Sequence, residues 1–212
     1  NNNLPTPHSL PPLVRGDTEG SKGRTGGFVF LSYFAFLGLG FMLVEVSLIQ
    51  KMILPLENPS YSFSVVLTSV LISSGLGSLL SHRVSMMRSR YVLFLISILI
   101  TAYSLFVPAI SDIVSPYPIP VRVAFIFIVL IPLGLLMGIP FPLGLSLLGR
   151  GNPTLIPWAW AINGCFSVLS PILTIMTAMA VGFKAVLLMG AAAYFLAFFT
   201  FPVSSFESPI KR

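Results

Sequence analysis

Two polar side chains lie within apolar stretches of this sequence, and they are its first candidates for chemistry. Glu45 interrupts the apolar run 28–49, and Asn163 lies within a second apolar stretch nearer the C-terminus. A carboxylate at membrane depth costs several kcal/mol unless it is paired, hydrated or protonated. Glu45 is therefore either a proton or cation site, or a structural carboxylate that is hydrogen-bonded or ion-paired within a helix bundle.

Helical spacing gives Glu45 a depth and a face. It lies six residues before Lys51, which is roughly 9 Å along a helix axis. It shares a helix face with Gly38 and Met42, and small residues on such a face favour close contact between helices. The candidate partners of Glu45 on neighbouring spans are Tyr61, Ser62, Ser64, Arg122 and Lys184.

Asn163 lies about six residues into its apolar stretch, near the membrane face opposite to the level of Glu45. Several small or hydroxyl residues of the second span are expected at a similar level, namely Ser73, Ser74, Gly75 and Gly77. Two interpretations of Asn163 stay open. The amide either makes a hydrogen bond between helices or lines a polar ligand pocket that opens to the cytoplasm.

The composition fixes the class of protein that positions these residues. Charged residues make up 8% of the 212 residues and hydrophobic residues 55%, whereas a soluble domain carries roughly 25% charged residues. Apolar stretches long enough to cross a bilayer as helices recur along the chain. They predict an all-α, six-helix transmembrane bundle with spans at 28–53, 61–80, 91–110, 121–145, 157–181 and 184–203.

Segments outside the spans give the domain organisation and the orientation. We expect a disordered arm over residues 1–25, rich in Pro, Gly, Ser and Asn, then the transmembrane domain 26–204 and a short tail 205–212. With the N-terminus inside, nine of the twelve basic residues lie on the inner side, and the outer side holds only Lys51, Arg122 and Lys184. This positive-inside bias predicts a multi-pass protein of the cell inner (cytoplasmic) membrane, with both termini cytoplasmic.

Two further expectations concern helix geometry. The connections between spans are short, which predicts antiparallel packing of helices that follow one another in the chain. The fourth span contains an unusual number of helix-weakening residues: Pro132, Gly134, Gly138, Pro140, Pro142 and Gly144. We therefore expect this helix to be bent or broken, either to line a substrate cavity or simply because its neighbours compensate for the lost hydrogen bonds.

The sequence contains no conventional catalytic constellation. His8 and His82 fall in different segments and Cys165 is the single cysteine, so neither a histidine pair nor a cysteine cluster is expected to bind a metal. Phosphate-binding GxxxxGK and nucleophile-elbow GxSxG motifs do not occur. The basic residues form no stripe interleaved with exposed aromatics, so nucleic acid is not an expected partner. We expect no enzyme activity from this chain alone, no cofactor and no metal.

Five ordered blocks carry a family resemblance. They are YFAFLGLGFMLVEVSLIQK at 33–51 followed by NPSYS at 58–62, SGLGSLLSHR at 74–83, GIPFPLGLSLL at 138–148, PWAWAINGCFSVLSP at 157–171, and GFKA at 182–185. The set resembles the membrane portion of bacterial spermidine-synthase-like integral membrane proteins. In that family the helices accompany a soluble methyltransferase-like domain, which has no counterpart here. The resemblance implies that Glu45, Gln50 and Asn163 are the polar positions of interest, and it does not transfer polyamine synthesis to this chain.

The arrangement of six spans with a basic loop after the second also resembles one half of a major-facilitator transporter. The corresponding loop usually carries an acidic residue, and Ser81 or His82 stands there in this sequence. A transporter of that type needs two halves, so a homodimer or a partner chain would be required.

These observations support two hypotheses from different classes. The first is a non-catalytic integral membrane subunit, or a detached membrane domain, that contacts membrane lipids and assembles with other membrane subunits or with itself. The alternative is a half-transporter for a small solute, such as a cation, with Glu45 as the coupling or recognition carboxylate.

Overall fold

A computed structural model of the chain describes residues 19–84 and 86–201, and all of the regular structure in these ranges is helical. The α-helices are α1 (Glu19–Leu56), α2 (Pro59–Leu80), α3 (Met86–Val114), α4 (Ile119–Met137), α5 (Pro140–Gly151), α6 (Ile156–Val181) and α7 (Phe183–Thr200). Two short 3₁₀ turns, Ser81–Arg83 and Pro153–Leu155, follow α2 and α5.

The predicted six-helix transmembrane bundle is confirmed. Six segments of the described residues are long and apolar enough to cross a bilayer: 27–56, 59–83, 90–114, 119–151, 153–181 and 183–200. The helices α4 and α5 together form the fourth of these spans. A chain with this architecture is a multi-pass membrane protein, because helices of this length satisfy their own backbone polar groups in lipid.

The first helix is longer at its N-terminal end than the sequence predicts. It begins at Glu19, so residues 19–25, which we expected in the disordered arm, are helical. Once a helix is nucleated, each further residue adds one hydrogen bond at little entropic cost, and the long apolar span 27–56 supplies that nucleus. The rest of the expected arm, residues 1–18, and the expected tail 205–212 lie outside the described residues.

The fourth span is broken, as its proline and glycine content predicts. The helix α4 ends at Met137, and α5 begins at Pro140. The amide of Gly138 still donates to the carbonyl of Gly134 (3.0 Å), and that of Ile139 donates to Leu136 (3.2 Å). Pro140 has no N–H to continue this series, so the backbone turns here and resumes as a new helix.

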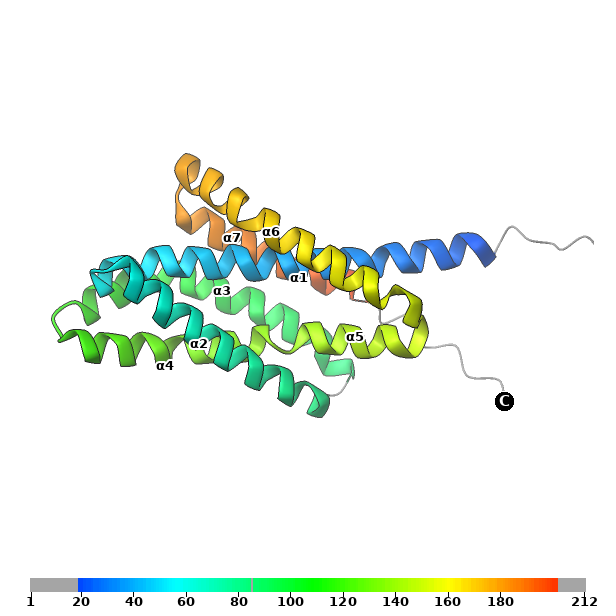
Figure 1. The fold of residues 1–212 in the computed structure, drawn as a ribbon, viewed down its shortest axis with the longest axis horizontal. Helices are drawn as coiled ribbons and strands as arrows, with labels where there is room; N and C mark the ends of the chain where they lie inside the picture. The colour runs from blue at the N-terminus through cyan, green and yellow to red at the C-terminus, as the bar shows by residue number, and fades with distance from the viewer. Residues whose placement is uncertain (1–18, 85, 202–212) are drawn as a thin grey trace, which may run out of the picture.

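Helices that are distant in sequence form the most extensive contacts. The helix α1 runs along the length of the bundle and packs mainly on α6 and α7, while α2 packs on α4 and α3 packs on α7 (Figure 1). Successive helices are also in contact, namely α1 with α2, α3 with α4 and α6 with α7, but less extensively. Short connections bring two helix ends together, but the shape of the side-chain surfaces decides how far the helices stay in contact.

Small residues explain the close pairing of α2 with α4. A Cβ atom at Gly77 would collide with the backbone carbonyl of Leu135, and one at Gly138 would collide with that of Ser74. A Cβ at Gly134 would meet the side chain of Ser73. These glycines let the two backbones approach closely, as in other membrane helix pairs.

Candidate functional site

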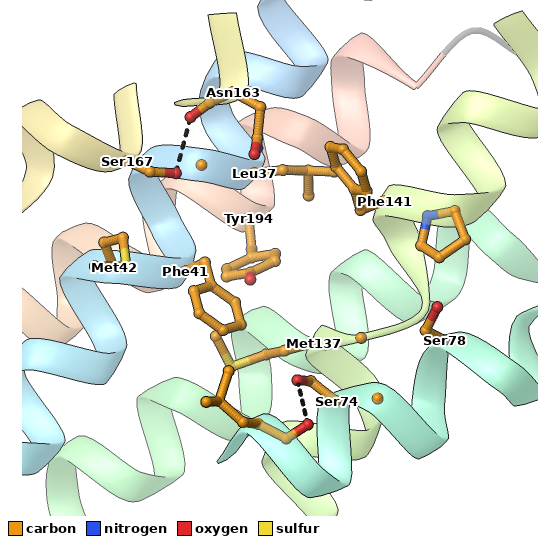
Figure 2. A pocket seen from close by; sticks show the side chains of 15 residues that line it. Leu37, Phe41, Met42, Ser74, Ser78, Met137, Phe141, Asn163, Ser167 and Tyr194 are labelled. Atoms are coloured by element: carbon orange, nitrogen blue, oxygen red, sulfur yellow. Dashed lines mark hydrogen bonds between the residues drawn. The ribbon is translucent and has the colours of Figure 1, made fainter. Parts of the chain in front are cut away.

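A cavity of about 460 Å³ lies where the break between α4 and α5 faces α1, α2, α6 and α7 (Figure 2). The cavity is partly open to the outside of the bundle. The residues that line it come from all of these elements: Leu37, Gly38, Phe41, Met42, Leu71, Ser74, Gly75, Ser78, Met137, Gly138, Phe141, Pro142, Asn163, Ser167 and Tyr194. Because they come from the middle part of most spans, the cavity lies at membrane depth.

Asn163 occupies the α6 side of the cavity and joins α6 to α1. Its Nδ2 donates a hydrogen bond to the carbonyl of Phe34 (3.1 Å). A Cβ at Gly38 would collide with the backbone carbonyl of Asn163, so this glycine allows the two helices to meet. Two turns further along α6, Ser170 donates to the carbonyl of Leu39 (2.9 Å). Asn163 therefore makes the hydrogen bond between helices of the first interpretation and also lines a cavity, while the ligand and the opening to the cytoplasm of the second interpretation stay predictions.

Residues of α2 form the opposite wall. Ser74, Gly75 and Ser78 face the cavity there, so α2 meets the cavity at the level that the sequence assigned to Asn163. The hydroxyl of Ser74 donates to the carbonyl of Leu71 in its own helix (3.2 Å). Ser73 points the other way, against α4, where it contacts the position of Gly134.

Glu45 lies next to this cavity and is almost completely buried. Its side chain is 4% exposed, and its Oε1 atom has no hydrogen-bond partner among the described residues. It lies one turn beyond Met42 on the helix face that lines the cavity. Tyr194 of α7 also lines the cavity.

The residues expected to neutralise Glu45 make other contacts. Ser62 donates its hydroxyl to the backbone carbonyl of Ile49. Arg122 forms an ion pair with Glu57 (2.7 Å) and donates to the carbonyl of Pro55 (2.9 Å). The three remaining expected partners are exposed: Tyr61, Ser64 and Lys184.

Depth explains why Arg122 has a different partner. It lies at the start of α4, level with the end of α1 at Leu56. Glu45 is eleven residues before Leu56, or roughly 16 Å along the helix axis. This separation exceeds the reach of an arginine side chain from that position.

Gln50 does not join the other two polar candidates. Its side chain is exposed and lines a smaller cavity of about 250 Å³, together with Lys51 and residues of α3 and α7. The structure therefore places Asn163 in the lining of the larger cavity and Glu45 one turn beyond that lining on α1, and it leaves Gln50 near the other end of α1.

Aromatic residues at the cavity were missed by reasoning from the sequence. Phe41, Phe141 and Tyr194 come from α1, α5 and α7 and line the same space (Figure 2). Only Tyr194 carries a signal in the sequence, because its hydroxyl interrupts the small and apolar run of the sixth span. The two phenylalanines are indistinguishable in sequence from the many others in lipid-facing positions.

The arrangement suits reversible binding of a small molecule. Within residues 19–84 and 86–201, no three histidine, cysteine, aspartate or glutamate side chains gather in a way that could hold a metal ion. A mostly apolar pocket with a few convergent polar groups is the usual form of a small-molecule site.

Comparison with known proteins adds no family to this description. We found no match to a protein-family model, to a curated protein or to a solved structure.

Proposed function

We propose that this chain is a non-catalytic integral membrane subunit, or a detached membrane domain, that assembles with partner proteins through its helix faces. The observation that carries this proposal is the polar wall of a partly open cavity at membrane depth. Polar side chains and irregular backbone at that depth are tolerated where protein or water covers them, and they are costly against lipid tails.

The cavity is flanked by two helices that do not close over it. α2 and α6 supply its polar side walls, and they are not among the extensively packed helix pairs of the described residues. In Figure 1, α1 lies between α2 and α6, and its residues Leu37, Gly38, Phe41 and Met42 also line the cavity. A second set of helices, from another copy or from a partner chain, would cover the edge between α2 and α6 and remove the polar wall from lipid.

The positive-inside bias supports a place in the bacterial inner membrane with both termini in the cytoplasm. The resemblance to spermidine-synthase-like membrane proteins supports a role as the membrane portion of a larger assembly. In that resemblance the helices accompany a soluble domain, so the assembly would bring this chain together with other parts.

A half-transporter for a small solute is the second candidate, and the order of helix pairing favours it. Three crossings, α1 to α3, are followed by three more, formed by α4 with α5, α6 and α7. The first helix of each triplet packs on the second helix of the other, and the two third helices pack together. This exchange is the pattern expected of two inverted three-helix repeats, from which major-facilitator halves are built.

Site-directed cross-linking tests the assembly. In a Cys165→Ser background, Gly75→Cys places one thiol on the α2 edge of the cavity, where an added Cβ has open space. We expect this thiol to cross-link in native membranes to a second copy or to a partner chain, and to stay in that complex in a gentle detergent. The matched control is Ala124→Cys on the exposed face of α4, which should cross-link much less.

The identity of the cross-linked chain separates the two candidates. A different membrane protein in stoichiometric amount supports the subunit. A second copy of this chain fits both candidates, and solute uptake into proteoliposomes would then support two halves of a transporter. A monomer in gentle detergent, with equal cross-linking from both thiols, would contradict the proposed assembly.

A further inference from the structure

The polar wall of the cavity between α1, α2, α5, α6 and α7 presents hydrogen-bond acceptors. Asn163 uses one N–H of its Nδ2 on the carbonyl of Phe34, which leaves the second N–H and the Oδ1 acceptor. The hydroxyl of Ser167 donates to the carbonyl of Asn163 (2.8 Å), and that of Ser74 donates to Leu71 (3.2 Å). Each hydroxyl oxygen keeps lone pairs once its proton is used. The wall therefore complements a ligand that brings donors.

Aromatic rings form another part of the lining. Phe41, Phe141 and Tyr194 reach the cavity from three different helices, and Figure 2 shows their rings around the open space. The face of an aromatic ring carries negative electrostatic potential and attracts organic cations, more strongly where water is excluded. Cations are thus favoured over anions by this part of the surface as well.

Glu45 supplies the charge. It lies one turn beyond Met42, a lining residue of α1, its side chain is buried, and Oε1 has no partner among the described residues. None of the residues that line the cavity is basic, and Arg122, the nearest candidate from α4, is committed to Glu57 and Pro55. A buried carboxylate without a protein counter-ion is strongly stabilised by a cationic ligand.

We propose that this cavity binds a small organic cation that carries hydrogen-bond donors, that is, a compound of the alkylammonium class. The cation sits among Phe41, Phe141 and Tyr194, its charge is balanced by Glu45, and its donors meet Asn163, Ser167 and Ser74. A volume of about 460 Å³ is within the usual range for small-molecule sites. The inference deepens the half-transporter candidate and rests on it only for movement of the ligand, because binding needs no second chain.

Equilibrium binding to the purified protein tests this proposal. Radiolabelled choline is the probe, because it combines a fixed cationic charge with a hydroxyl donor. We expect saturable binding that butylammonium displaces. The neutral isostere of choline, 3,3-dimethylbutan-1-ol, has the same shape without the charge and should not compete at similar concentrations.

Three variants assign the site. Glu45→Gln keeps the shape of the side chain and removes its charge, and we expect affinity to fall by roughly tenfold to a hundredfold. Phe41→Leu removes one ring and should weaken binding by about threefold to tenfold. The matched control is Asp112→Asn, which removes an exposed carboxylate at the end of α3 and should leave affinity unchanged.

Several outcomes would overturn the proposal. Equal affinity of the wild type and Glu45→Gln, in a folded variant, would remove the carboxylate from the site. Competition by the neutral isostere as strong as by butylammonium would show an apolar site without charge selectivity. Binding without uptake into proteoliposomes would leave the ligand class standing and contradict only the half-transporter.

The ammonium could belong to a free solute or to a lipid headgroup, and native mass spectrometry distinguishes the two sources. A retained aminophospholipid that choline displaces would assign the site to a lipid headgroup and keep the ligand class. Loss of choline binding after all lipid is removed, with no lipid able to restore it in a folded protein, would count against the cavity as the site.

Discussion

Two polar centres of this bundle differ in how completely their hydrogen-bonding capacity is used. The first surrounds Arg122 at the start of α4. Its guanidinium donates to the carbonyls of Pro55 (2.9 Å), Tyr117 (2.6 Å) and Ser115 (2.5 Å), and to the carboxylate of Glu57 (2.7 Å). This centre joins the connection between α1 and α2 to the connection between α3 and α4. Its polar groups satisfy one another.

The second centre is the cavity beside Glu45. Glu45 is buried and Arg122 is only partly buried, yet Oε1 of Glu45 has no partner among the described residues. A polar group that is satisfied within the protein holds a structure together, whereas one that is buried and unsatisfied reduces stability. The Arg122 centre stabilises the fold, and we propose that the Glu45 centre serves binding instead.

Arg122→Gln should give the largest loss of stability. The variant removes hydrogen bonds to three carbonyls and an ion pair, so we expect unfolding to become easier by about 2–3 kcal/mol. Titration of SDS into mild-detergent micelles measures this change.

Glu57→Gln is the control for the charge itself. Because Glu57 is 63% exposed, its ion pair contributes under about 1 kcal/mol, and the variant should be nearly as stable as the wild type. If both variants lost the same stability, the ion pair rather than the carbonyl contacts would hold this end of the bundle.

Asn163→Ala should have an intermediate effect. It removes the bond to the carbonyl of Phe34, and hydrogen bonds between membrane helices are worth roughly 0.6 kcal/mol on average. The matched variant Ser170→Ala removes the bond to Leu39 from the same helix pair, away from the cavity. Similar losses in the same SDS titration are expected for both, whereas only Asn163→Ala should also weaken ligand binding. A larger effect of Ser170→Ala on binding would contradict this division.

The extent of the helices was predictable because it depends on local sequence. The lengths of the apolar stretches set the six spans. Gly138 and Pro140 mark the break in the fourth span. The start of α1 was not predictable from composition, because Glu19 to Thr25 resembles a flexible arm. Helix propagation from the long apolar span overrides the weak local preference of these residues.

The arrangement of the site was less accessible to sequence reasoning. Residue counts placed Asn163 at the level of Ser74 and Gly75 of the second span, and these three residues do line one cavity. That Tyr194 of α7 and Met42 of α1 line one cavity depends on the packing of α7 on α1, which no local pattern specifies. Likewise, Arg122 and Glu57 pair through two connections whose geometry is set by the whole bundle.

Glu45→Gln should have the smallest effect on stability. Whether it lowers the free energy of unfolding decides if the Glu45 centre differs from the Arg122 centre. The Oε1 atom of Glu45 is buried and has no hydrogen-bond partner among the described residues. The substitution replaces the carboxylate by a neutral amide of the same shape. Removing an uncompensated buried charge does not destabilise a fold and often stabilises it. We therefore expect a free energy of unfolding equal to that of the wild type or up to about 1 kcal/mol higher. The control Asp112→Asn should have the same free energy of unfolding as the wild type.

The same SDS titration measures this difference. A loss comparable to that of Arg122→Gln would mean that Glu45 stabilises the bundle, and the distinction between a structural and a binding centre would fail. Unchanged or higher stability together with lost choline binding is the combination that a structural carboxylate cannot produce. Only a group whose interactions are completed by a ligand should be dispensable for folding and necessary for binding.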